Sequence, residues 1–464
     1  MRRWLLPGIL TLATASSAVL ALGWPRPGAA GEEGPGPRTP VLSPRRVPAL
    51  LSQVVADTRL RSALDATLAE PALGGGRDRS CLVVRHGSRP IFVRRPDERL
   101  IPASNLKVLT AVAVLSRLGP EERLVTEVRA GRPPGPGGVV DGPLWLVGGG
   151  DPLLATADYA ASFMNQPQLY TPMEALADRV VAAGVREVRG GVIGDETRYD
   201  TQRYVPTWRP VYVTAPEVGP ASALDVNDGF AVFAPRHVAA PEPDVHAAGV
   251  LTALLQARGV RVSAPPGEGR TPGGASTLAR LPSHPVRELV GEMLRESDNL
   301  TAELLVKELG HRFAGRGTTA AGVGVMRDAL AAAGLPVSHL AAVDGSGLDR
   351  ADRASCTLLL AALDTTGRKG AVAAGFPVAA RDGTLARRFL GNPAAGRLQA
   401  KTGALEGVAG LNGFVDLAAG GEPLVFSLLA NDLPRDAVGR ALQERVGAVL
   451  ARYPEAPPPA TLAP

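Results

Sequence analysis

The sequence predicts an α+β protein in which one antiparallel sheet, packed with helices, is interrupted by a large inserted module of mixed α/β structure. Three observations along the 464 residues support this fold class. Residues 47–119 combine helical apolar spacing with a hairpin, residues 120–282 consist of short β-like runs, and residues 283–454 return to long helices followed by strands. Because strands occur near both ends of the chain, we expect distant segments to build one sheet.

The first part of the main domain contains a helix, a hairpin and a second helix. Apolar residues recur at helical spacing through residues 48–69, and residues 80–85 and 90–94 flank a His-Gly-Ser-Arg turn. Ser104 then stands at a natural helix start, and Gly119 is a stop signal. The helix between them is apolar nearly all round, which predicts that it is buried.

The inserted module and the second part of the main domain follow. Clusters of Gly and Pro in the module separate β-like runs at 124–129, 144–147, 188–194 and 229–234, and helical stretches at 171–183 and 247–258. The second part predicts helices at 284–296, 300–309, 318–333 and 436–453, and strands at 396–402, 407–415 and 423–430. The Pro- and Ala-rich tail, residues 455–464, is predicted to be disordered.

The N-terminus has the pattern of an export signal. Arg2 and Arg3 precede an uncharged run from residue 4 to residue 24, and a Pro/Gly/Glu-rich stretch follows. We expect residues 1–30 to be a signal peptide or an uncleaved membrane anchor, and residues 31–46 to be a flexible linker. The protein would then be extracytoplasmic, either secreted or anchored to the outer face of the cytoplasmic membrane.

Charge and composition exclude several classes of function. Fifty basic and 45 acidic side chains give a net charge of +5, which is too balanced to indicate a nucleic-acid partner. The six histidines are scattered without metal-ligand spacing, so neither a metal, a cofactor nor a Ser-His-Asp triad is expected. Cys81 and Cys356 could pair in an exported protein. We expect two buried thiols instead, because one pair is not a disulfide framework.

Lysine usage points to the chemistry. The chain has four lysines (Lys107, Lys307, Lys369 and Lys401) against 46 arginines, so a retained lysine suggests a task that guanidinium cannot perform, such as acting as a base. Lys107 lies three residues after Ser104, and residues at this spacing share a helix face. A helix N-terminus would also place backbone N–H groups near the hydroxyl.

Two further motifs follow in order. Ser297-Asp298-Asn299 lies between two predicted helices, and Lys401-Thr402-Gly403-Ala404 ends a predicted strand. Each motif alone is weak, because Ser, Asp and Asn are ordinary cap residues and a glycine in a strand can simply allow close backbone approach. The order S-x-x-K, S-x-N, K-T-G, with each motif on the expected element, is far more specific.

With these motifs the chain resembles the serine penicillin-recognising family, which includes β-lactamases and penicillin-binding proteins. The 190 positions between Lys107 and Ser297 make it similar to the low-molecular-mass D-alanyl-D-alanine carboxypeptidase/endopeptidase branch, whose members carry large domains inserted there. Further similar stretches are residues 102–110, 148–152, 194–195, 344–348 and 382–385. The resemblance covers roughly residues 50–453 and implies a penicillin-recognising serine transpeptidase-like fold.

The resemblance also implies a function and a set of roles. The protein would remove D-Ala from peptidoglycan stem peptides through an acyl-enzyme on Ser104, and β-lactam antibiotics would acylate the same serine. Lys107 would be the base and Ser297 would relay a proton to the leaving amine. Substrate would contact the residues Asn299, Lys401, Thr402, Gly403 and Ala404. Ala404 stands where many members of the family carry Thr. The family uses the backbone N–H of this residue, which Ala also provides.

Two other functions stay open at this stage. A β-lactamase would share the acylation step and deacylate quickly, but the long insertion argues against it. A catalytically silent wall-binding or sensor protein could keep the fold, but the intact motifs argue against decay. The sequence leaves open whether the inserted module positions glycan, binds a partner or shields the cleft. It also leaves open the balance of carboxypeptidase and endopeptidase activity, and the diamino acid of the stem peptide.

Overall fold

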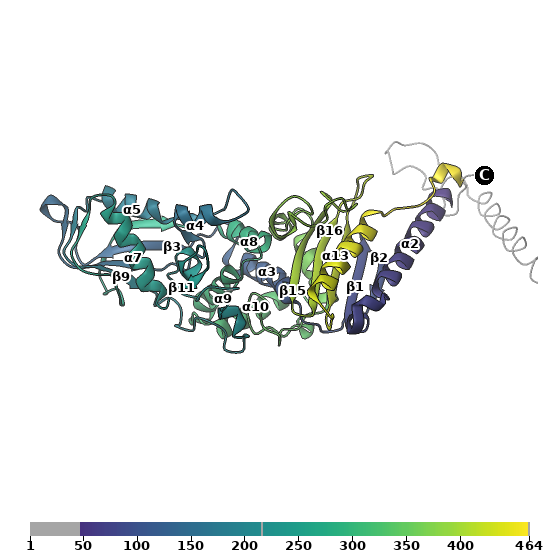
Figure 1. Ribbon diagram of the computed structural model, residues 1–464, viewed down its shortest axis with the longest axis horizontal. Coiled ribbons are helices and arrows are strands. Elements are labelled where there is room, and N and C mark those ends of the chain that lie inside the picture. The colour runs from purple at the N-terminus through teal and green to yellow at the C-terminus, as the bar shows by residue number, and fades with distance from the viewer. Residues whose placement is uncertain (1–46, 215–216, 463–464) are drawn as a thin grey trace, which may run out of the picture. The chain divides into compact units, whose positions relative to one another are not determined.

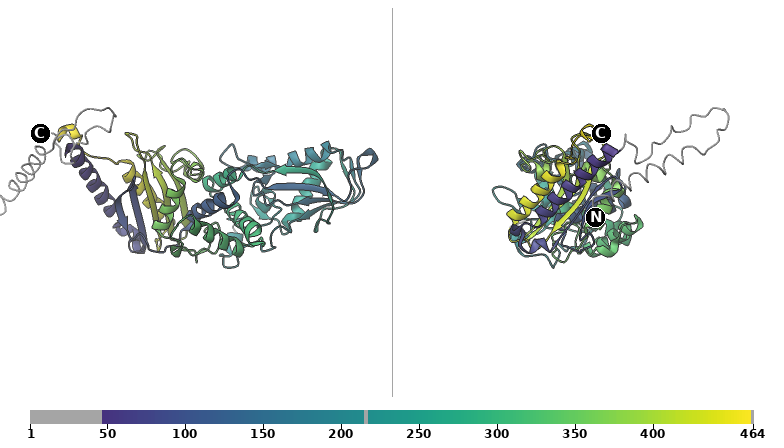
Figure 2. Two further views of the ribbon diagram at one scale, coloured as in Figure 1. Left: turned by 180° about the vertical axis from the view of Figure 1, so that it is seen from behind. Right: turned by 90° about the vertical axis from the view of Figure 1, so that its right-hand side faces the viewer.

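A five-stranded antiparallel sheet combines strands from the early and the late part of the chain (Figure 1). The structure is a computed structural model that describes residues 47–214 and 217–462. The strand order is β15-β16-β17-β1-β2. The strands are β1 (Ser80–His86), β2 (Arg89–Arg94), β15 (Leu398–Leu405), β16 (Val408–Val415) and β17 (Leu424–Ala430). β1 pairs with β17, so strands from opposite ends of the colour scale lie side by side in Figures 1 and 2. The predicted α+β fold class is confirmed.

Helices cover both faces of this sheet: α2 (Val47–Leu68) and α13 (Asp436–Ala451) lie on one face, and α3 (Leu106–Leu118) and α11 (Cys356–Thr366) on the other. Alternate strand residues point to opposite faces. Val84 therefore packs in the hydrophobic cluster that contains α13, whereas its neighbour Val83 packs in the cluster that contains α3. The sheet sits between two hydrophobic cores.

Residues 106–114 of helix α3 are all buried, as the apolar sequence predicted, and the last turn of the helix reaches the surface. The helices α8 (Val286–Arg295), α9 (Asn299–Ala314) and α10 (Thr319–Ala332) pack around it. A short 3-10 turn, η2 (Ala103–Asn105), leads into α3, and Ser104 lies in this turn. The nucleophile predicted at the helix start is thus held just ahead of the helix, against the sheet edge formed by β15.

The inserted segment forms a second five-stranded sheet, of order β13-β9-β5-β3-β14. Its strands are β3 (Val125–Ala130), β5 (Leu144–Val147), β9 (Val192–Asp195), β13 (Gly267–Glu268) and β14 (Ser276–Pro282). The pairs β13/β9 and β9/β5 are parallel, and the pairs β5/β3 and β3/β14 are antiparallel. The helices α5 (Met173–Ala182) and α7 (Pro243–Gln256) share its hydrophobic cluster, which gives this part a core of its own.

Short elements complete the chain. They are β4 (Val139–Val140), β6 (Leu154–Ala155), β7 (Thr171–Pro172), β8 (Glu187–Val188), β10 (Phe230–Val232), β11 (Val238–Ala239), β12 (Arg261–Val262), α4 (Ala157–Ser162), α6 (Val211–Thr214) and α12 (Ala371–Ala374). The predicted strand at 188–194 is divided between β8 and β9, which belong to different sheets, because Gly190 and Gly191 stand between them. Helix α11 was not predicted from the residue pattern.

The expectation of two free thiols is wrong. Cys81 and Cys356 form a disulfide, with their Cα atoms 6.0 Å apart, and both are fully buried. Cys81 lies in β1 and Cys356 begins α11, which packs on β1. A separation of 275 positions concealed this contact, because α11 had not been predicted.

Two expectations concern the chain ends. The predicted signal or anchor (residues 1–30) and the predicted linker (residues 31–46) lie outside the described residues. The tail, expected to be disordered, contains a short 3-10 turn at Pro459–Thr461. Within residues 47–214 and 217–462, no helix is both long and apolar enough to span a bilayer.

Candidate active site

The S-x-x-K motif brings a hydroxyl and an amine together at the start of α3. Lys107 Nζ lies 3.1 Å from Ser104 Oγ. The amine also reaches Asn299 Oδ1 at 2.7 Å and the carbonyl oxygen of Ser346 at 2.8 Å. Ala103, before the serine, has a φ of 48°, and the chain therefore turns sharply into the helix at this point. Three acceptors thus surround the Lys107 amine.

The S-x-N motif runs from the loop after α8 into the first residue of α9. Ser297 adopts a left-handed φ of 64°, and the Asp298 side chain caps α9 by accepting the N–H of Thr301 at 3.2 Å. This cap fixes the first residue of α9, Asn299, whose side chain accepts from Lys107. The cap role that such residues commonly have is therefore real here. It holds the motif in place beside the S-x-x-K pair.

The K-T-G motif lies in β15, the edge strand of the main sheet. Lys401 is fully buried, and its Nζ donates to Ser297 Oγ and to the Thr402 carbonyl oxygen, both at 2.8 Å. Gly403 faces the nucleophile turn: a Cβ at this position would lie 2.3 Å from Asn105 Nδ2. Glycine is therefore required for the turn and the strand to approach each other this closely.

Alternate residues of β15 direct their backbone N–H and C=O groups away from β16, off the edge of the sheet. The backbone of Leu398 and Ala400 bonds away from β16, to Ala379 N and Pro377 O at 2.9 and 3.1 Å. The pairing with β16 is regular from Leu398 to Leu405, so Thr402 and Ala404 present their N–H groups to the same side. The Ala404 N–H is thus directed away from β16, off the edge of the sheet, and Ala404 lines the same cavity as Ser104.

Burial sets the electrostatics of both lysines. Desolvation of the fully buried Lys107 lowers its pKa to about 8, against the opposing effect of the nearby carboxylates Asp344, Asp298 and Glu303. Burial, together with the positive charge of Lys107, lowers the pKa of Lys401 well below its usual value. The amine beside Ser104 is therefore able to lose its proton near neutral pH.

Several supporting residues were not assigned by the sequence motifs. Glu303 Oε1 accepts the N–H groups of Gly345 and Ser346 at 3.0 and 2.8 Å, which positions the Ser346 carbonyl for Lys107. Burial raises the pKa of this Glu303 carboxyl to about 8. Thr384 Oγ1 lies 3.2 Å from Thr402 Oγ1. Ser346 and Thr384 fall in stretches 344–348 and 382–385, whose resemblance was noted, but Glu303 had no sequence signal beyond its place in a buried helix.

The three motifs border one cavity of about 630 Å³. Its lining includes the motif residues Ser104, Ser297, Asn299, Thr402 and Ala404. The inserted module contributes a second wall, with Tyr159, Phe163, Glu217 and Asp228 among its residues. Lys107, Lys401 and Gly403 lie buried behind the motif wall. All eight sequence-predicted site residues therefore come together at one place.

The wall from the inserted module is acidic but partly neutralised. Burial raises the pKa of Asp228 to about 8, and Tyr159 donates its hydroxyl to this carboxylate at 2.6 Å. On the side of the main domain, burial likewise raises the pKa of Glu292, a cavity residue of α8, to about 7. In the part of the chain that the structure describes, no three His, Cys, Asp or Glu side chains are grouped so that they could hold a metal ion.

Comparison with known proteins agrees with this geometry. The sequence pattern of the D-Ala-D-Ala carboxypeptidase 3 (S13) family matches residues 60–235 and 231–453. A D-alanyl-D-alanine carboxypeptidase of Actinomadura sp. is 30% identical over 85% of each chain. Carboxypeptidase DacB of Mycolicibacterium smegmatis is 31% identical over 95% of this chain and 94% of that protein.

Solved structures share the fold. Penicillin-binding protein 4 of Haemophilus influenzae superposes with a TM-score of 0.68 at 19% identity, over 80% of this chain and 94% of that one. A second structure of that protein, in complex with a β-lactam, gives a TM-score of 0.61 at 19% identity, over 83% and 97% of the two chains. The fold, the placement of the three motifs and the sequence matches lead to one conclusion: this chain belongs to the D-Ala-D-Ala carboxypeptidase 3 (S13) family of serine peptidases.

Proposed function

We propose that this protein is a serine-type D-Ala-D-Ala carboxypeptidase and endopeptidase that acts on peptidoglycan stem peptides through an acyl-enzyme on Ser104. The observation that carries the proposal is the Lys107 amine, 3.1 Å from the Ser104 hydroxyl and with a pKa of about 8. A neutral amine has two N–H groups and one lone pair. Asn299 Oδ1 and the Ser346 carbonyl accept the two N–H groups, which leaves the lone pair for the Ser104 proton.

Acylation then follows from the arrangement. Ser104 Oγ attacks the carbonyl carbon of the penultimate D-Ala as its proton passes to Lys107 Nζ. The N–H groups of Ser104 and Ala404 would receive the developing oxyanion. The outward direction of the Ala404 N–H on the edge of β15 supports this role. An Ala in place of the Thr of many members leaves that backbone group unchanged.

The second lysine connects proton transfer to substrate binding. Ser297 Oγ, held by Lys401 at 2.8 Å, would pass a proton to the leaving amine of the terminal D-Ala. Lys401 and Thr402 would hold the terminal carboxylate of the substrate. Gly403, where β15 approaches the nucleophile turn, would belong to the same binding site. An arriving carboxylate favours the charged form of Lys401, which burial otherwise disfavours. Asn299 would bind the peptide amide, and water would finally hydrolyse the ester on Ser104.

The proposal extends to inhibitors and to location. β-Lactam antibiotics are proposed to acylate Ser104 by the same attack. We also propose that the protein acts outside the cytoplasm, after export directed by the N-terminal segment, whether that segment is cleaved or kept as an anchor. The buried Cys81–Cys356 disulfide supports export, because such bonds form and persist in oxidising compartments.

Product analysis by mass spectrometry tests the activity. Purified protein is incubated with peptidoglycan fragments that contain uncross-linked pentapeptides and cross-linked dimers. Loss of one D-Ala from the pentapeptide establishes the carboxypeptidase, and conversion of dimers to monomers establishes the endopeptidase. If neither product forms while a fluorescent penicillin still labels the protein, the assigned substrate is wrong.

A further inference from the structure

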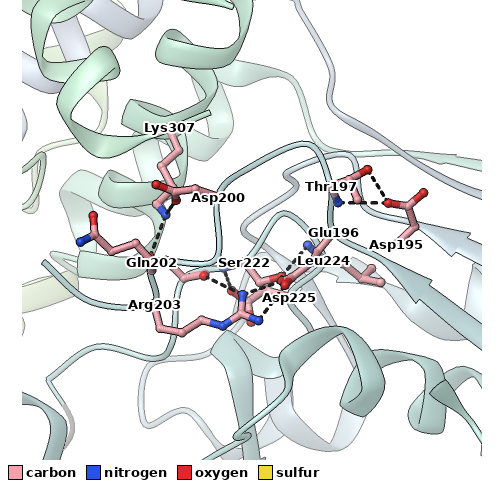
Figure 3. Close-up of polar contacts among 11 residues, drawn as sticks. Asp195, Glu196, Thr197, Asp200, Gln202, Arg203, Ser222, Leu224, Asp225 and Lys307 are labelled. Carbon is pink, nitrogen blue, oxygen red and sulfur yellow. Dashed lines mark hydrogen bonds and ion pairs between the residues drawn. The ribbon is translucent and has the colours of Figure 1, made fainter. Parts of the chain in front are cut away.

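Lys307 is a buried lysine that the proposed mechanism does not use. It lies in α9 and is 1% exposed, in a chain where arginine supplies 46 of 50 basic side chains. Its Nζ forms an ion pair with Asp200 and donates to the Gln202 carbonyl oxygen at 2.8 Å (Figure 3). Both partners belong to the inserted module. A buried ammonium needs such partners, so this contact fixes where the loop around Asp200 can lie.

One face of α9 connects this contact to the active site. Asn299, Glu303 and Lys307 are spaced by four residues and therefore lie along the same side of the helix. Asn299 bonds to Lys107, and Glu303 holds the Gly345–Ser346 backbone. Lys307 continues this row to the inserted module. The loop that Lys307 holds is therefore positioned by the same helix that carries Asn299 of the S-x-N motif.

Neighbouring contacts show that the loop is docked over its whole length. Arg198 donates to both carboxylate oxygens of Glu308, at 2.8 and 2.6 Å, and Tyr199 donates to the same side chain at 2.9 Å. A Cβ on Gly317 would lie 2.4 Å from the Arg198 carbonyl oxygen. One hydrophobic cluster combines side chains of the module with side chains of α9, namely Tyr199, Val205, Trp208, Tyr212, Val218, Ala221, Ala223, Leu300 and Leu304.

Arg203 connects the loop that Lys307 holds to a second segment of the module, residues 217–228. Its guanidinium donates to Glu196 at 2.5 and 2.7 Å, and Ser222 Oγ donates to the same carboxylate at 2.5 Å (Figure 3). The Ala221 N–H donates to the Arg203 carbonyl oxygen at 2.9 Å. Asp225 then accepts the Ser222 N–H at 3.0 Å. The segment 217–228 is thereby tied to the loop that Lys307 holds.

The segment 217–228 meets the active site at both of its ends. The Glu217 carbonyl oxygen accepts from Asn299 Nδ2 at 2.7 Å, which orients the amide so that its oxygen faces Lys107. Asp228 and Glu217 line the same cavity as Ser104. The position of this segment therefore sets the width of the cavity beyond the catalytic motifs.

We propose that Lys307 is a positioning residue that, through Asp200, Gln202 and Arg203, fixes the segment 217–228 as the wall against which the stem peptide lies. This proposal rests on the proposed function and adds a role for the inserted module, which then acts as part of the substrate site. Lysine suits the position because its compact ammonium reaches two acceptors in a slot with almost no free volume, about 10 Å³.

The test compares a long and a small ligand of Ser104 in Asp200→Asn, Lys307→Met and the double variant. We expect the KM for a stem pentapeptide to rise about 10-fold or more, since displacement of a positioning element can cost up to about 100-fold. The rate of Ser104 acylation by a small fluorescent penicillin should fall much less than the KM rises, because its reacting groups lie on η2, α3, β15 and the start of α9. Of these groups, Asn299 contacts the segment, through the Glu217 carbonyl oxygen. The double variant should be no worse than Lys307→Met, because the two residues form one contact.

The matched control is Asp178→Asn, which removes an ion pair between α5 and Arg258, two residues beyond the end of α7 and away from the cavity lining. It should leave both the KM for the pentapeptide and the rate of penicillin acylation unchanged. Hydrogen exchange gives a readout without peptidase activity: backbone amides of residues 198–203 and 217–228 should exchange faster in Asp200→Asn than in Asp178→Asn. If Lys307→Met does not fold, Asp200→Asn alone decides.

Two results would overturn the proposal. One is an unchanged KM with unchanged exchange in Asp200→Asn. The other is an equal loss of pentapeptide cleavage and penicillin acylation, which would assign Lys307 to general support of the fold. If instead the wild type releases no D-Ala although penicillin labels Ser104, the proposed substrate fails, and the exchange measurement still decides whether Lys307 holds the wall.

Discussion

Asn299 Oδ1 accepts a hydrogen bond from Lys107 Nζ at 2.7 Å, although the two residues are 192 positions apart in the sequence. The entire inserted module lies between them along the chain. The fold therefore brings together two residues of the candidate active site that the insertion separates in the sequence. The position of the amine beside Ser104 depends on contacts from α9 and from the loop that contains Ser346.

The acylation rate should rise with pH in step with the loss of the Lys107 proton. Burial disfavours the ammonium form and lowers the pKa to about 8, so the basic amine makes up roughly a tenth of the molecules at pH 7 and most of them above pH 9. Stopped-flow measurement of fluorescent-penicillin acylation from pH 6 to pH 10 should give a rising curve with a midpoint near 8.

Lys107→Arg is the matched variant for this pH profile. Its guanidinium keeps a positive charge but does not deprotonate, so acylation should fall by about 100-fold or more and the midpoint near pH 8 should disappear. A wild-type profile that is flat over this range, or an arginine variant with near-normal acylation, would show that Lys107 is not the base.

Gly403→Ala should impair acylation because the strand and the nucleophile turn would be forced apart. The added methyl group would lie 2.3 Å from Asn105 Nδ2 and 2.8 Å from the Pro102 carbonyl oxygen. We expect a loss of roughly 1–3 kcal/mol of stability from such overpacking, and a larger relative loss of penicillin acylation. Urea denaturation and acylation rates measure the two effects.

The control for that substitution is Gly324→Ala in α10. No atom lies within 4 Å of a Cβ there, and the position is helical, so stability should stay the same or rise by up to about 1 kcal/mol. Equal behaviour of the two alanine variants would refute the close approach at Gly403.

Reduction of the Cys81–Cys356 bond should destabilise the fold. The bond closes a loop of 275 positions and joins β1 to α11, so its loss should cost roughly 2–5 kcal/mol. Denaturant midpoints of Cys81→Ala/Cys356→Ala and the wild type, each with and without reductant, test this. Only the wild type should respond to the reductant, and two free thiols in the unreduced wild-type protein would contradict the pairing.

Much of the main domain could be predicted because its signals are local. The hairpin of β1 and β2, the buried helix α3 and the strands β15 to β17 all follow from apolar periodicity and turn residues. That the eight candidate residues lie together could be predicted because three short motifs combine residue type and order.

The missed features depend on contacts between distant segments. Helix α11 was overlooked, and the Cys81–Cys356 disulfide was missed with it. Glu303 and Lys307 looked like ordinary residues of a buried helix, and their importance comes from partners supplied by residues 344–346 and 200–202. No local pattern in a single sequence specifies which loops meet at one helix face.

The location of the acyl group tests the central claim most directly. The protein is mixed with penicillin, and separately with a stem pentapeptide and quenched rapidly, and the covalent adduct is mapped by tandem mass spectrometry of proteolytic fragments. We predict that both ligands modify the Ser104 hydroxyl and that Ser104→Ala, still folded, takes up neither. An adduct on another residue, or persistent labelling of Ser104→Ala, would contradict the assignment of Ser104 as the nucleophile.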